Sequence, residues 1–440
     1  MNPEQGRVEF KDIPVNLNRN IDILFVIDNS GSMSEEQANL RTNFPNFINV
    51  LNSIQGGLPD VHIGVVTSDM GTKGEDDATP GPQVGAVGQG GCANTGDSGN
   101  MKTNGAPVTG VFLSDIQDAT GMRVRNYTGD LSTVFGQMAS VGAVGCGFEQ
   151  HLHSMHAALN NNSANAGFLR PDAFLAVIFL ADEDDCSMSH STLLGPDGGP
   201  LGPQQSFRCT RFGVTCDVGG TNDTEMNQVG VKDQCHSNEQ SQYLKNVASY
   251  VSFLKSLKPD PLQVIVAGII GTTEPFAVEL RTINGVSQPA LAHSCSYQSG
   301  TTTNFADPPV RIQFFLDQFP NRSTATTICQ ADLSGGLQQI AELLKTAIGN
   351  PCIEGNLADV DPNTPGDQYD CTVSYVNNYG KPNQTETVIP PCTAGAQPCW
   401  ELLVDAAQCP LGDNLILKVN DPGTPPLDTH IIANCVTEAI

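Results

Sequence analysis

The stretch from Ile21 to Met33, IDILFVIDNSGSM, constrains the fold of this chain more than any other segment. Five consecutive apolar residues, Ile23 to Ile27, indicate a strand buried on both faces, which is typical of the centre of a parallel sheet covered by helices. The run ends at Asp28, and Asn29 to Ser32 then turn the chain before an amphipathic helical pattern begins. This order predicts a central strand, a polar turn and a helix.

The polar turn supplies oxygen atoms at the place where open α/β sheets bind ligands. Asp28, Ser30 and Ser32 offer one carboxylate and two hydroxyls directly after the carboxyl end of the strand. Such hard oxygen ligands suit Mg²⁺ first, with Mn²⁺ and Ca²⁺ as alternatives. A helix N-cap and turn would use the same residue types, so the turn by itself leaves both interpretations open.

Further apolar runs alternate with helical patterns along the chain. Buried strands are predicted at Val61 to Thr67, Phe174 to Ala181 and Leu262 to Ile270, and a closing helix at Leu337 to Ile348. This alternation indicates a doubly wound, mostly parallel α/β sheet flanked by helices. Two long polar segments, at about 70–110 and 187–238, are predicted insertions, because loops of this length within a domain are uncommon.

Asp182 follows the buried strand that begins at Phe174 and repeats the arrangement at Asp28. Together these positions resemble the metal-ion-dependent adhesion site of von Willebrand factor A domains, and the first loop has the Asp-x-Ser-x-Ser pattern of that site. The resemblance covers roughly Ile21 to Ile348. It implies a von Willebrand factor A-like fold in which Asp182 and the first loop hold a divalent cation, and a carboxylate of a partner completes the coordination.

One feature departs from that family pattern. The family takes a Thr hydroxyl from the loop before the helix that begins here near Glu149, yet no Thr lies between Ala139 and Gln150. Glu149 is therefore a candidate additional ligand, with a plain acidic residue at a helix amino end as the alternative. Other candidates for an additional metal ligand or an outer contact are Thr67, Asp69 and Asp184.

The fourteen cysteines indicate disulfides, because the chain contains no paired C-x-x-C motif of the kind that holds zinc or iron–sulfur clusters. Beyond residue 350 the helical patterns give way to short β-rich runs with six cysteines. We therefore expect a lead-in segment at 1–20, the α/β domain at 21–349 and a small disulfide-rich β module at 350–440.

Composition bears on compartment and partners. The chain carries 47 acidic against 21 basic residues, a net charge of −26, which argues against nucleic acid or anionic lipid as a partner. No apolar run is long enough to span a bilayer. Oxidised cysteines without an apolar leader after Met1 lead us to expect that an export signal, plain or of the lipoprotein type, preceded this sequence.

Three segments point to a narrower group of proteins within this resemblance. They are Thr67-Ser68-Asp69, Gly145 to Gln150 and Asp182 to Ser187. They look like the cysteine-rich A-domain proteins of myxobacterial and related envelopes, which include surface lipoproteins and a gliding-motility adhesin. The resemblance implies a secreted or cell-surface protein of the bacterial envelope, with an outer-membrane lipid anchor as one form.

The function expected from these features is adhesion or protein binding through a divalent cation that engages an acidic residue of a partner. The alternative is a structural or scaffold envelope protein in which an ion only stabilises the fold. No G-x-S-x-G, H-E-x-x-H or phosphate-loop motif occurs, so we do not expect an enzyme. His151, His153 and His156 lack the spacing of a helical zinc site and are predicted to pack or to lie on a helix surface.

Overall fold

The computed structural model describes residues 8–14, 19–54, 56–118, 120–283, 285–348, 352–353, 355–361, 363, 368–379, 381–406, 409, 411–423 and 429–438. At its centre is a seven-stranded sheet with the order β14-β9-β6-β2-β3-β4-β5. Its strands are β2 (Asn20–Ile27), β3 (Asp60–Thr67), β4 (Leu113–Gln117), β5 (Arg123–Arg125), β6 (Phe174–Leu180), β9 (Val264–Ile270) and β14 (Ser323–Thr327).

The middle of this sheet is parallel. β2 pairs in parallel with β3 on one side and β6 on the other, and β9 and β14 continue the parallel run. β4 and β5 are antiparallel additions at one edge. The expected α/β class with a mostly parallel sheet is therefore confirmed, because runs that are apolar at every position need a covering layer on both faces.

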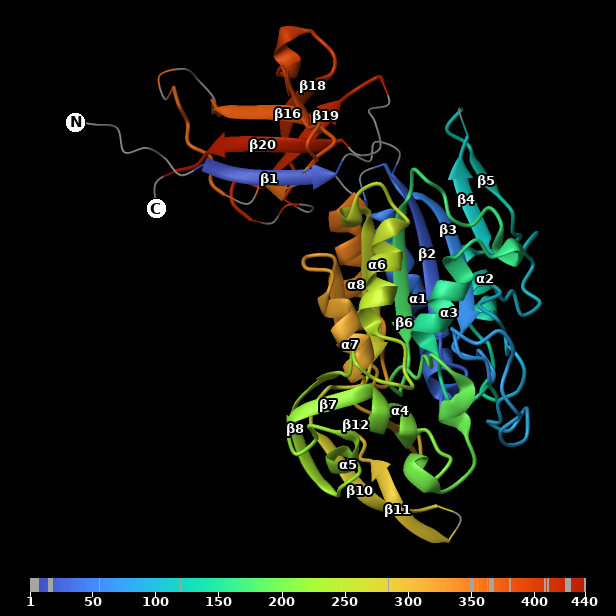
Figure 1. Ribbon diagram of the computed structural model, residues 1–440. Helices are drawn as coiled ribbons and strands as arrows, with labels where there is room; N and C mark the ends of the chain where they lie inside the picture. Colours follow the sequence, from blue (N-terminus) through green and yellow to red (C-terminus); the bar gives the residue numbers. More distant parts are fainter. Residues whose placement is uncertain are drawn as a thin grey trace.

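Helices cover both faces of the sheet (Figure 1). The helices are α1 (Ser34–Asn52), α2 (Leu131–Met138), α3 (His151–Leu159), α4 (Phe207–Gly213), α5 (Asp223–Met226), α6 (Val247–Ser256), α7 (Val310–Asp317) and α8 (Ser334–Ile348). Buried side chains of α1, α2 and α8 form one hydrophobic cluster with the sheet, and those of α3, α6 and α7 form the other. The central domain thus has three layers.

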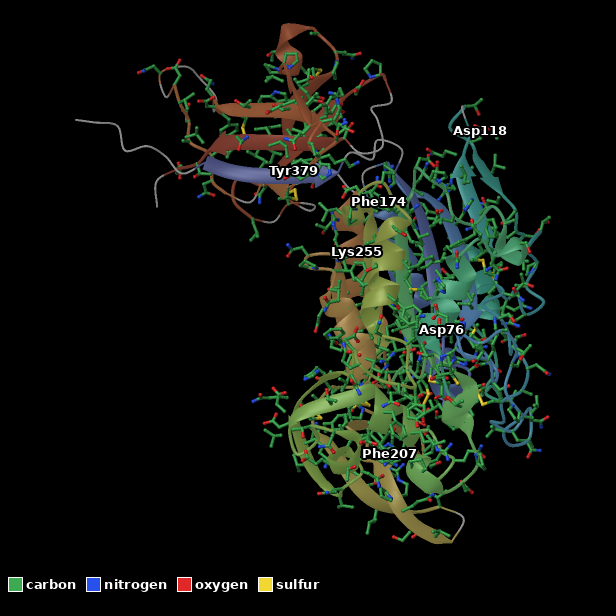
Figure 2. The ribbon with its side chains drawn as sticks, viewed as in Figure 1. Asp76, Asp118, Phe174, Phe207, Lys255 and Tyr379 are labelled. Carbon is green, nitrogen blue, oxygen red and sulfur yellow. A yellow bond between two sulfur atoms is a disulfide. The ribbon has the colours of Figure 1, made fainter. Side chains whose placement is uncertain are left out.

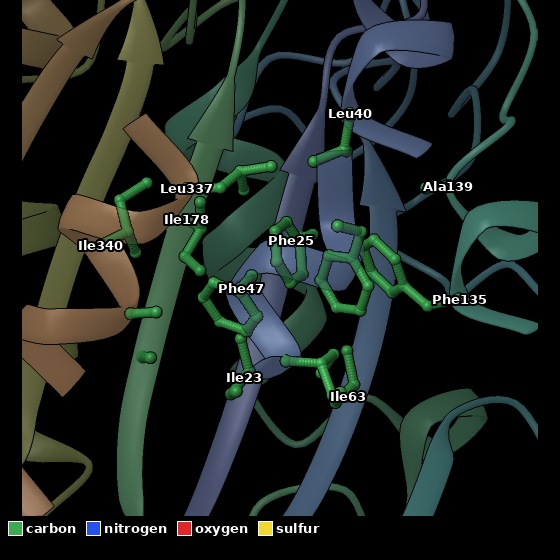
Figure 3. Close-up of a cluster of buried hydrophobic side chains, with 14 of the residues drawn as sticks. Ile23, Phe25, Leu40, Phe47, Ile63, Phe135, Ala139, Ile178, Leu337 and Ile340 are labelled. Carbon is green, nitrogen blue, oxygen red and sulfur yellow. The ribbon is translucent and has the colours of Figure 1, made fainter. Parts of the chain in front are cut away.

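The first of these clusters is built around Phe25 on β2. This side chain is fully buried, and its ring centroid lies 5.9 Å from that of Phe44, 6.1 Å from that of Phe47 and 4.7 Å from that of Phe135. Figure 3 shows Phe25 and Phe47 together with Phe135 and the apolar side chains around them. Because aromatic rings bury large areas, this cluster holds α1 and α2 on the sheet and fixes the direction in which α1 leaves the polar turn.

The chain beyond α8 forms two small sheets together with β1, in the orders β1-β20-β16-β17 and β15-β19-β18. Their strands are β1 (Val8–Pro14), β15 (Cys352–Ile353), β16 (Cys371–Asn377), β17 (Thr385–Ile389), β18 (Cys399–Val404), β19 (Leu415–Asn420) and β20 (His430–Val436). β1 pairs with β20 along its whole length. The lead-in segment predicted at 1–20 thus contributes a strand to the C-terminal module, a long-range pairing that its local pattern did not indicate.

Deleting residues 1–14 is therefore expected to destabilise the C-terminal module and to leave the central sheet intact. The deletion removes all seven residue pairs of β1 with β20 and exposes the edge of β20. We expect the melting temperature of the module to fall by about 5 °C or more. Differential scanning calorimetry with limited proteolysis measures this. Deletion of residues 1–7, which keeps β1, is the matched control, and equal effects of both deletions would contradict the prediction.

Part of the predicted insertion at 187–238 joins strands from 276–306, a segment that the sequence analysis did not mark as an insertion, at the other end of the domain. The strands β7 (Val214–Val218), β8 (Gly230–Ser237), β10 (Phe276–Ile283) and β11 (Val286–Leu291) form one antiparallel sheet, and β12 (Cys295–Ser299) and β13 (Thr302–Ala306) form a hairpin. β8 and β10 come from segments on either side of β9. In Figure 2, Phe174 at the start of β6 lies toward Tyr379 of the C-terminal module, and Phe207 lies among the inserted elements. The carboxyl ends of the parallel strands therefore face these additional elements.

All fourteen cysteines are paired, which confirms the disulfide prediction. The pairs are Cys92–Cys146, Cys186–Cys209, Cys216–Cys235, Cys295–Cys329, Cys352–Cys409, Cys371–Cys435 and Cys392–Cys399. Two bridges lie next to the candidate site, because Cys146 belongs to the loop before α3 and Cys186 follows Asp182 by four residues. These bridges restrain the loops that carry the acidic residues.

A charged cluster closes the opposite, amino edge of the sheet. Asp22 on β2 is fully buried and accepts hydrogen bonds from the Nε and backbone N–H of Arg170, at 2.7 Å each. Lys258 Nζ lies 4.0 Å from its Oδ2. His62 lies on the other side, with Nδ1 at 3.6 Å from Asp22 Oδ1 and 2.8 Å from the carbonyl oxygen of Phe168. Burial among these groups lowers the pKa of His62 to about 4.

This lowered pKa predicts a loss of stability in mild acid. Between the ordinary histidine pKa of 6.5 and about 4, the unfolded chain binds a proton at His62 that the folded chain does not bind. The free energy of unfolding therefore decreases as the pH falls through this range. Allowing for solvent screening, we expect His62→Gln to remove on the order of 1 kcal/mol of the decrease between pH 7 and pH 5. Hydrogen exchange of the amides in β2 and β3 measures the free energy of unfolding at each pH, and His236→Gln, at a surface position, is the control. If the free energy of unfolding falls equally steeply with pH in His62→Gln and in the wild-type chain, the prediction is wrong.

Candidate functional site

The candidate site lies where the carboxyl ends of β2, β3 and β6 meet. The backbone N–H of Asp28 donates to the Leu180 carbonyl at 2.9 Å, and that of Ser68 donates to the Ile27 carbonyl at 3.2 Å. Parallel pairing therefore continues to the last residue of each strand. As a result, the polar residues that follow the three strands gather at one edge of the sheet.

Asp28 is fully buried in this group. Its Oδ1 accepts hydrogen bonds from the backbone N–H of Ser30 at 2.7 Å and from the hydroxyl of Ser68 at 3.4 Å. Its Oδ2 has no hydrogen-bond partner. Gln37 on α1 donates to the backbone carbonyl of Asp28 at 3.0 Å and holds the turn against the helix. No hydrogen bond of ordinary geometry reaches Oδ2, although His151 Nε2 lies 3.4 Å away.

The other predicted ligands stand beside it. The hydroxyl oxygens of Ser30 and Ser32 are 3.3 Å apart, and the Ser32 hydroxyl forms a hydrogen bond with the Asp182 carboxylate. Asp182 is 3 % exposed, and its Oδ1 has no hydrogen-bond partner. The structure thus brings together the four residues that the sequence analysis assigned to a metal.

Glu149 and Glu183 add two more carboxyl groups. Glu149 directly precedes Gln150 and the start of α3, is 1 % exposed, and has an Oε1 atom without a hydrogen-bond partner. Its carboxyl group shares a hydrogen bond with that of Glu183. Glu149 therefore lies in the acidic group.

The electrostatics of this group favour a positive charge. Burial raises the pKa of Glu149 and of Asp182 well above the ordinary values, and the neighbouring carboxylates raise both further. Burial likewise raises the pKa of Glu183 to about 7. Carboxylates that crowd together away from water resist ionisation unless a cation neutralises them. Without a cation these carboxyl groups therefore favour the protonated, neutral form, and a cation bound among them would favour their ionised form.

His151 is a member of this site that the sequence analysis missed. It is fully buried, neither ring nitrogen has a hydrogen-bond partner, and Nε2 lies 3.4 Å from Asp28 Oδ2. Burial lowers the pKa of His151, but the nearby carboxylates, Asp28 first, raise it by more. One imidazolium balances one carboxylate, so acidic groups remain in excess. Its position two residues after Glu149 is the only sequence signal for this role, and it does not say which way the ring points.

Three further candidates have partners within the protein. The Thr67 hydroxyl donates to Asp97 Oδ2 at 2.6 Å, and Asp69 accepts from the backbone N–H of Gly71 at 2.8 Å. Asp184 accepts from the backbone N–H groups of Arg311 and Ile312, at 3.0 and 3.1 Å, at the start of α7. These contacts give Asp69 a role in the loop and Asp184 a role at a helix amino end.

Over the part of the chain that the structure describes, no three His, Cys, Asp or Glu side chains form a group that could hold a metal by themselves. A cation at this site would therefore depend on serine hydroxyls, water and a group from outside the chain as well. The residues fit a hard dication of that kind, because the unpartnered oxygens of Asp28, Glu149 and Asp182 are buried in one group with two hydroxyls beside them.

These features define a disulfide-linked α/β protein with a parallel-rich sheet and a buried acidic group at its carboxyl edge. No family model matches the chain, and no curated protein matches it. Among solved structures, the pilus adhesin RrgA from Streptococcus pneumoniae is similar, with 13 % identity over 99 % of this chain and a TM-score of 0.22. This chain spans 58 % of that adhesin chain. A likeness this low carries no argument about fold or function.

Among the helices that the structure describes, none combines the length and the apolar character needed to cross a membrane.

Proposed function

We propose that this chain is a von Willebrand factor A-like binding module that engages an acidic residue of a partner through a divalent cation, Mg²⁺ first. Asp28, Ser30, Ser32 and Asp182 hold the cation, and Glu149 contributes. A bound dication supplies positive charge that attracts a carboxylate. The proposal makes the protein an adhesion or protein-binding module rather than an enzyme.

One observation carries the proposal: three carboxylate oxygens, on Asp28, Glu149 and Asp182, are buried in one group without hydrogen-bond partners. A buried carboxylate oxygen without a donor costs free energy, and a cation bound among these residues would offset part of that cost. The serine hydroxyls beside them add neutral oxygen ligands of the type that hard dications accept.

Each protein group has a distinct part in binding. The backbone N–H of Ser30 fixes Oδ1 of Asp28, and Oδ2 lies beside His151 Nε2, which a cation at this position would have to displace or repel. The Ser32 hydroxyl orients Asp182 in the same way. His151 limits the negative charge beside Asp28 when no cation is present. The seven disulfides support a secreted or cell-surface location, because such bridges persist in oxidising compartments.

Calorimetric titration with Mg²⁺, Mn²⁺ and Ca²⁺ tests the cation directly. We expect the wild-type chain to bind and Asp28→Ala to abolish binding, because the variant removes a carboxylate at the centre of the group. Glu149→Gln is expected to weaken binding roughly tenfold, equivalent to about 1.4 kcal/mol. Glu35→Gln, which removes an acidic group near the site and none of the proposed ligands, is the matched control and should bind normally.

Two results would contradict the proposal. If the wild-type chain takes up no dication at millimolar concentration, the cation mechanism fails. If a cation binds and stabilises the fold but no carboxylate ligand binds in a cation-dependent way, the scaffold function applies instead.

A further inference from the structure

A cavity of about 340 Å³ opens beside the candidate cation site. On one side it is lined by Ser32 and Glu35, at the polar turn and the start of α1, and by Asp182 after β6. Its volume lies within the range of about 300–1,000 Å³ that is typical of ligand sites. Asp182, which is 3 % exposed and whose Oδ1 has no hydrogen-bond partner, belongs to this lining.

The other side of the cavity is strand β13. All five of its residues, Thr302 to Ala306, line the cavity. Successive residues of a strand point to opposite faces, so a cavity against one face would contact only every second residue. Contact with five consecutive residues indicates that the cavity runs along the edge of the strand.

That edge of β13 is open. β13 pairs with β12 on its other side, in a two-stranded sheet. Over the described residues, no backbone hydrogen bond joins Thr302–Phe305 to an element other than β12. The outward N–H and C=O groups of an edge strand are a template for pairing with another chain.

The hairpin is also held in place relative to the candidate cation site. The backbone N–H of Asp307, the residue after β13, donates to the backbone carbonyl of Asp182 at 2.7 Å. The Asp307 carboxylate lies 2.6 Å from His293 Nδ1, and the His293 ring stacks on Phe305 with centroids 4.7 Å apart. The open edge of β13 therefore ends beside Asp182, one of the residues that we propose hold the cation.

We infer that the partner presents an extended peptide segment that adds a third strand to the edge of β13 and directs one acidic side chain to the cation. The carboxylate contact rests on the proposed function, whereas the strand pairing rests on the edge itself. Backbone groups of β13 need a partner with its own regular N–H and C=O groups, which identifies a peptide rather than a saccharide. Glu35, Asp182, Glu183 and Asp307 all border the cavity, so the residues flanking the acidic side chain are uncharged or basic.

The test uses the whole chain in 5 mM Mg²⁺ and two libraries of capped heptapeptides. One library has Asp at the central position and random uncharged residues elsewhere, and the other has Asn at the centre. We expect peptides from the Asp library to bind at least tenfold more tightly than their Asn counterparts, and EDTA to remove this preference. Methylation of alternate backbone nitrogens in an enriched peptide is expected to weaken binding at least tenfold.

Hydrogen exchange supplies a readout that does not depend on the cation. We expect bound peptide to slow exchange of amides within Thr302–Ala306 and to leave β17, another edge strand, unchanged. If a backbone-methylated peptide binds equally well and β13 is not protected, strand addition is wrong. In that case a Mg²⁺-dependent preference for Asp would still support the proposed function. Protection of β13 by peptides without any effect of Mg²⁺ would support strand addition and refute the cation mechanism. Failure of both libraries to bind overturns the inference.

Discussion

Replacing Asp182 by Asn is expected to stabilise the protein in EDTA and to abolish the stabilisation that Mg²⁺ gives to the wild-type chain. Without a cation, Asp182 is a buried acidic group with an unpartnered oxygen, and burial beside other acidic groups makes its ionised form unfavourable. The amide keeps the shape of the side chain and an acceptor for Ser32 but carries no charge. We expect the variant in EDTA to gain on the order of 1 kcal/mol in the free energy of unfolding.

In Mg²⁺ the order of the two proteins should reverse. A ligand that binds only the folded state at about 100 times its dissociation constant adds about 2.7 kcal/mol. The wild-type chain should gain this amount, and the Asp182→Asn variant should gain almost none. Thermal unfolding in EDTA and in Mg²⁺ measures both effects, with Glu35→Gln as a control that should behave as wild type does. A wild-type chain whose unfolding is unchanged by Mg²⁺ would refute the proposed site.

Replacing Arg311 by Met is expected to destabilise the central domain by about 3–5 kcal/mol, because it leaves a buried carboxylate without its counter-charge. Arg311 at the start of α7 is fully buried, and its Nη2 lies 3.0 Å from Asp185 Oδ2, also fully buried. The same guanidinium donates to the Lys245 carbonyl at 2.8 Å and to the Asp185 carbonyl at 3.1 Å. It therefore joins α7 to the segment that carries Asp182.

A double-mutant cycle separates the ion pair from the rest of this effect. Chemical unfolding of Arg311→Met, Asp185→Asn and the double variant gives the coupling between the two side chains. We expect the double variant to be more stable than Arg311→Met, because it removes the isolated charge. A loss below about 1 kcal/mol for Arg311→Met would show that water or another cation compensates Asp185, and that the pair does not hold α7 in place.

Much of the central domain could be predicted because its signals are local. Runs that are apolar at every position, such as Ile23 to Ile27 and Phe174 to Leu180, need cover on both faces, and the structure places them in the middle of a parallel sheet. Polar residues that directly follow such strands meet at one edge, so Asp28 and Asp182 could be expected to lie together. An even number of cysteines without metal-type spacing predicted disulfides, and all are paired.

Other features depend on pairings between distant segments, and a local sequence pattern does not show which segments pair. β1 joins β20 across almost the whole chain, and β8 joins β10 across β9. The connectivity of the disulfides belongs to the same class, since spacing alone allows many arrangements. These contacts form between surfaces that exist only after the separate elements have folded.

The candidate site divides in the same way. The sequence by itself determined which residues follow the buried strands, and hence that Asp28, Ser30, Ser32 and Asp182 lie at one edge, because strand direction alone sets that position. Only the tertiary structure decided that Glu149, Glu183 and His151 face this group. It also decided that the other three candidates, Thr67, Asp69 and Asp184, have different partners. The direction of each of these side chains follows from how its loop or helix packs against the sheet, and packing is a property of the assembled layers.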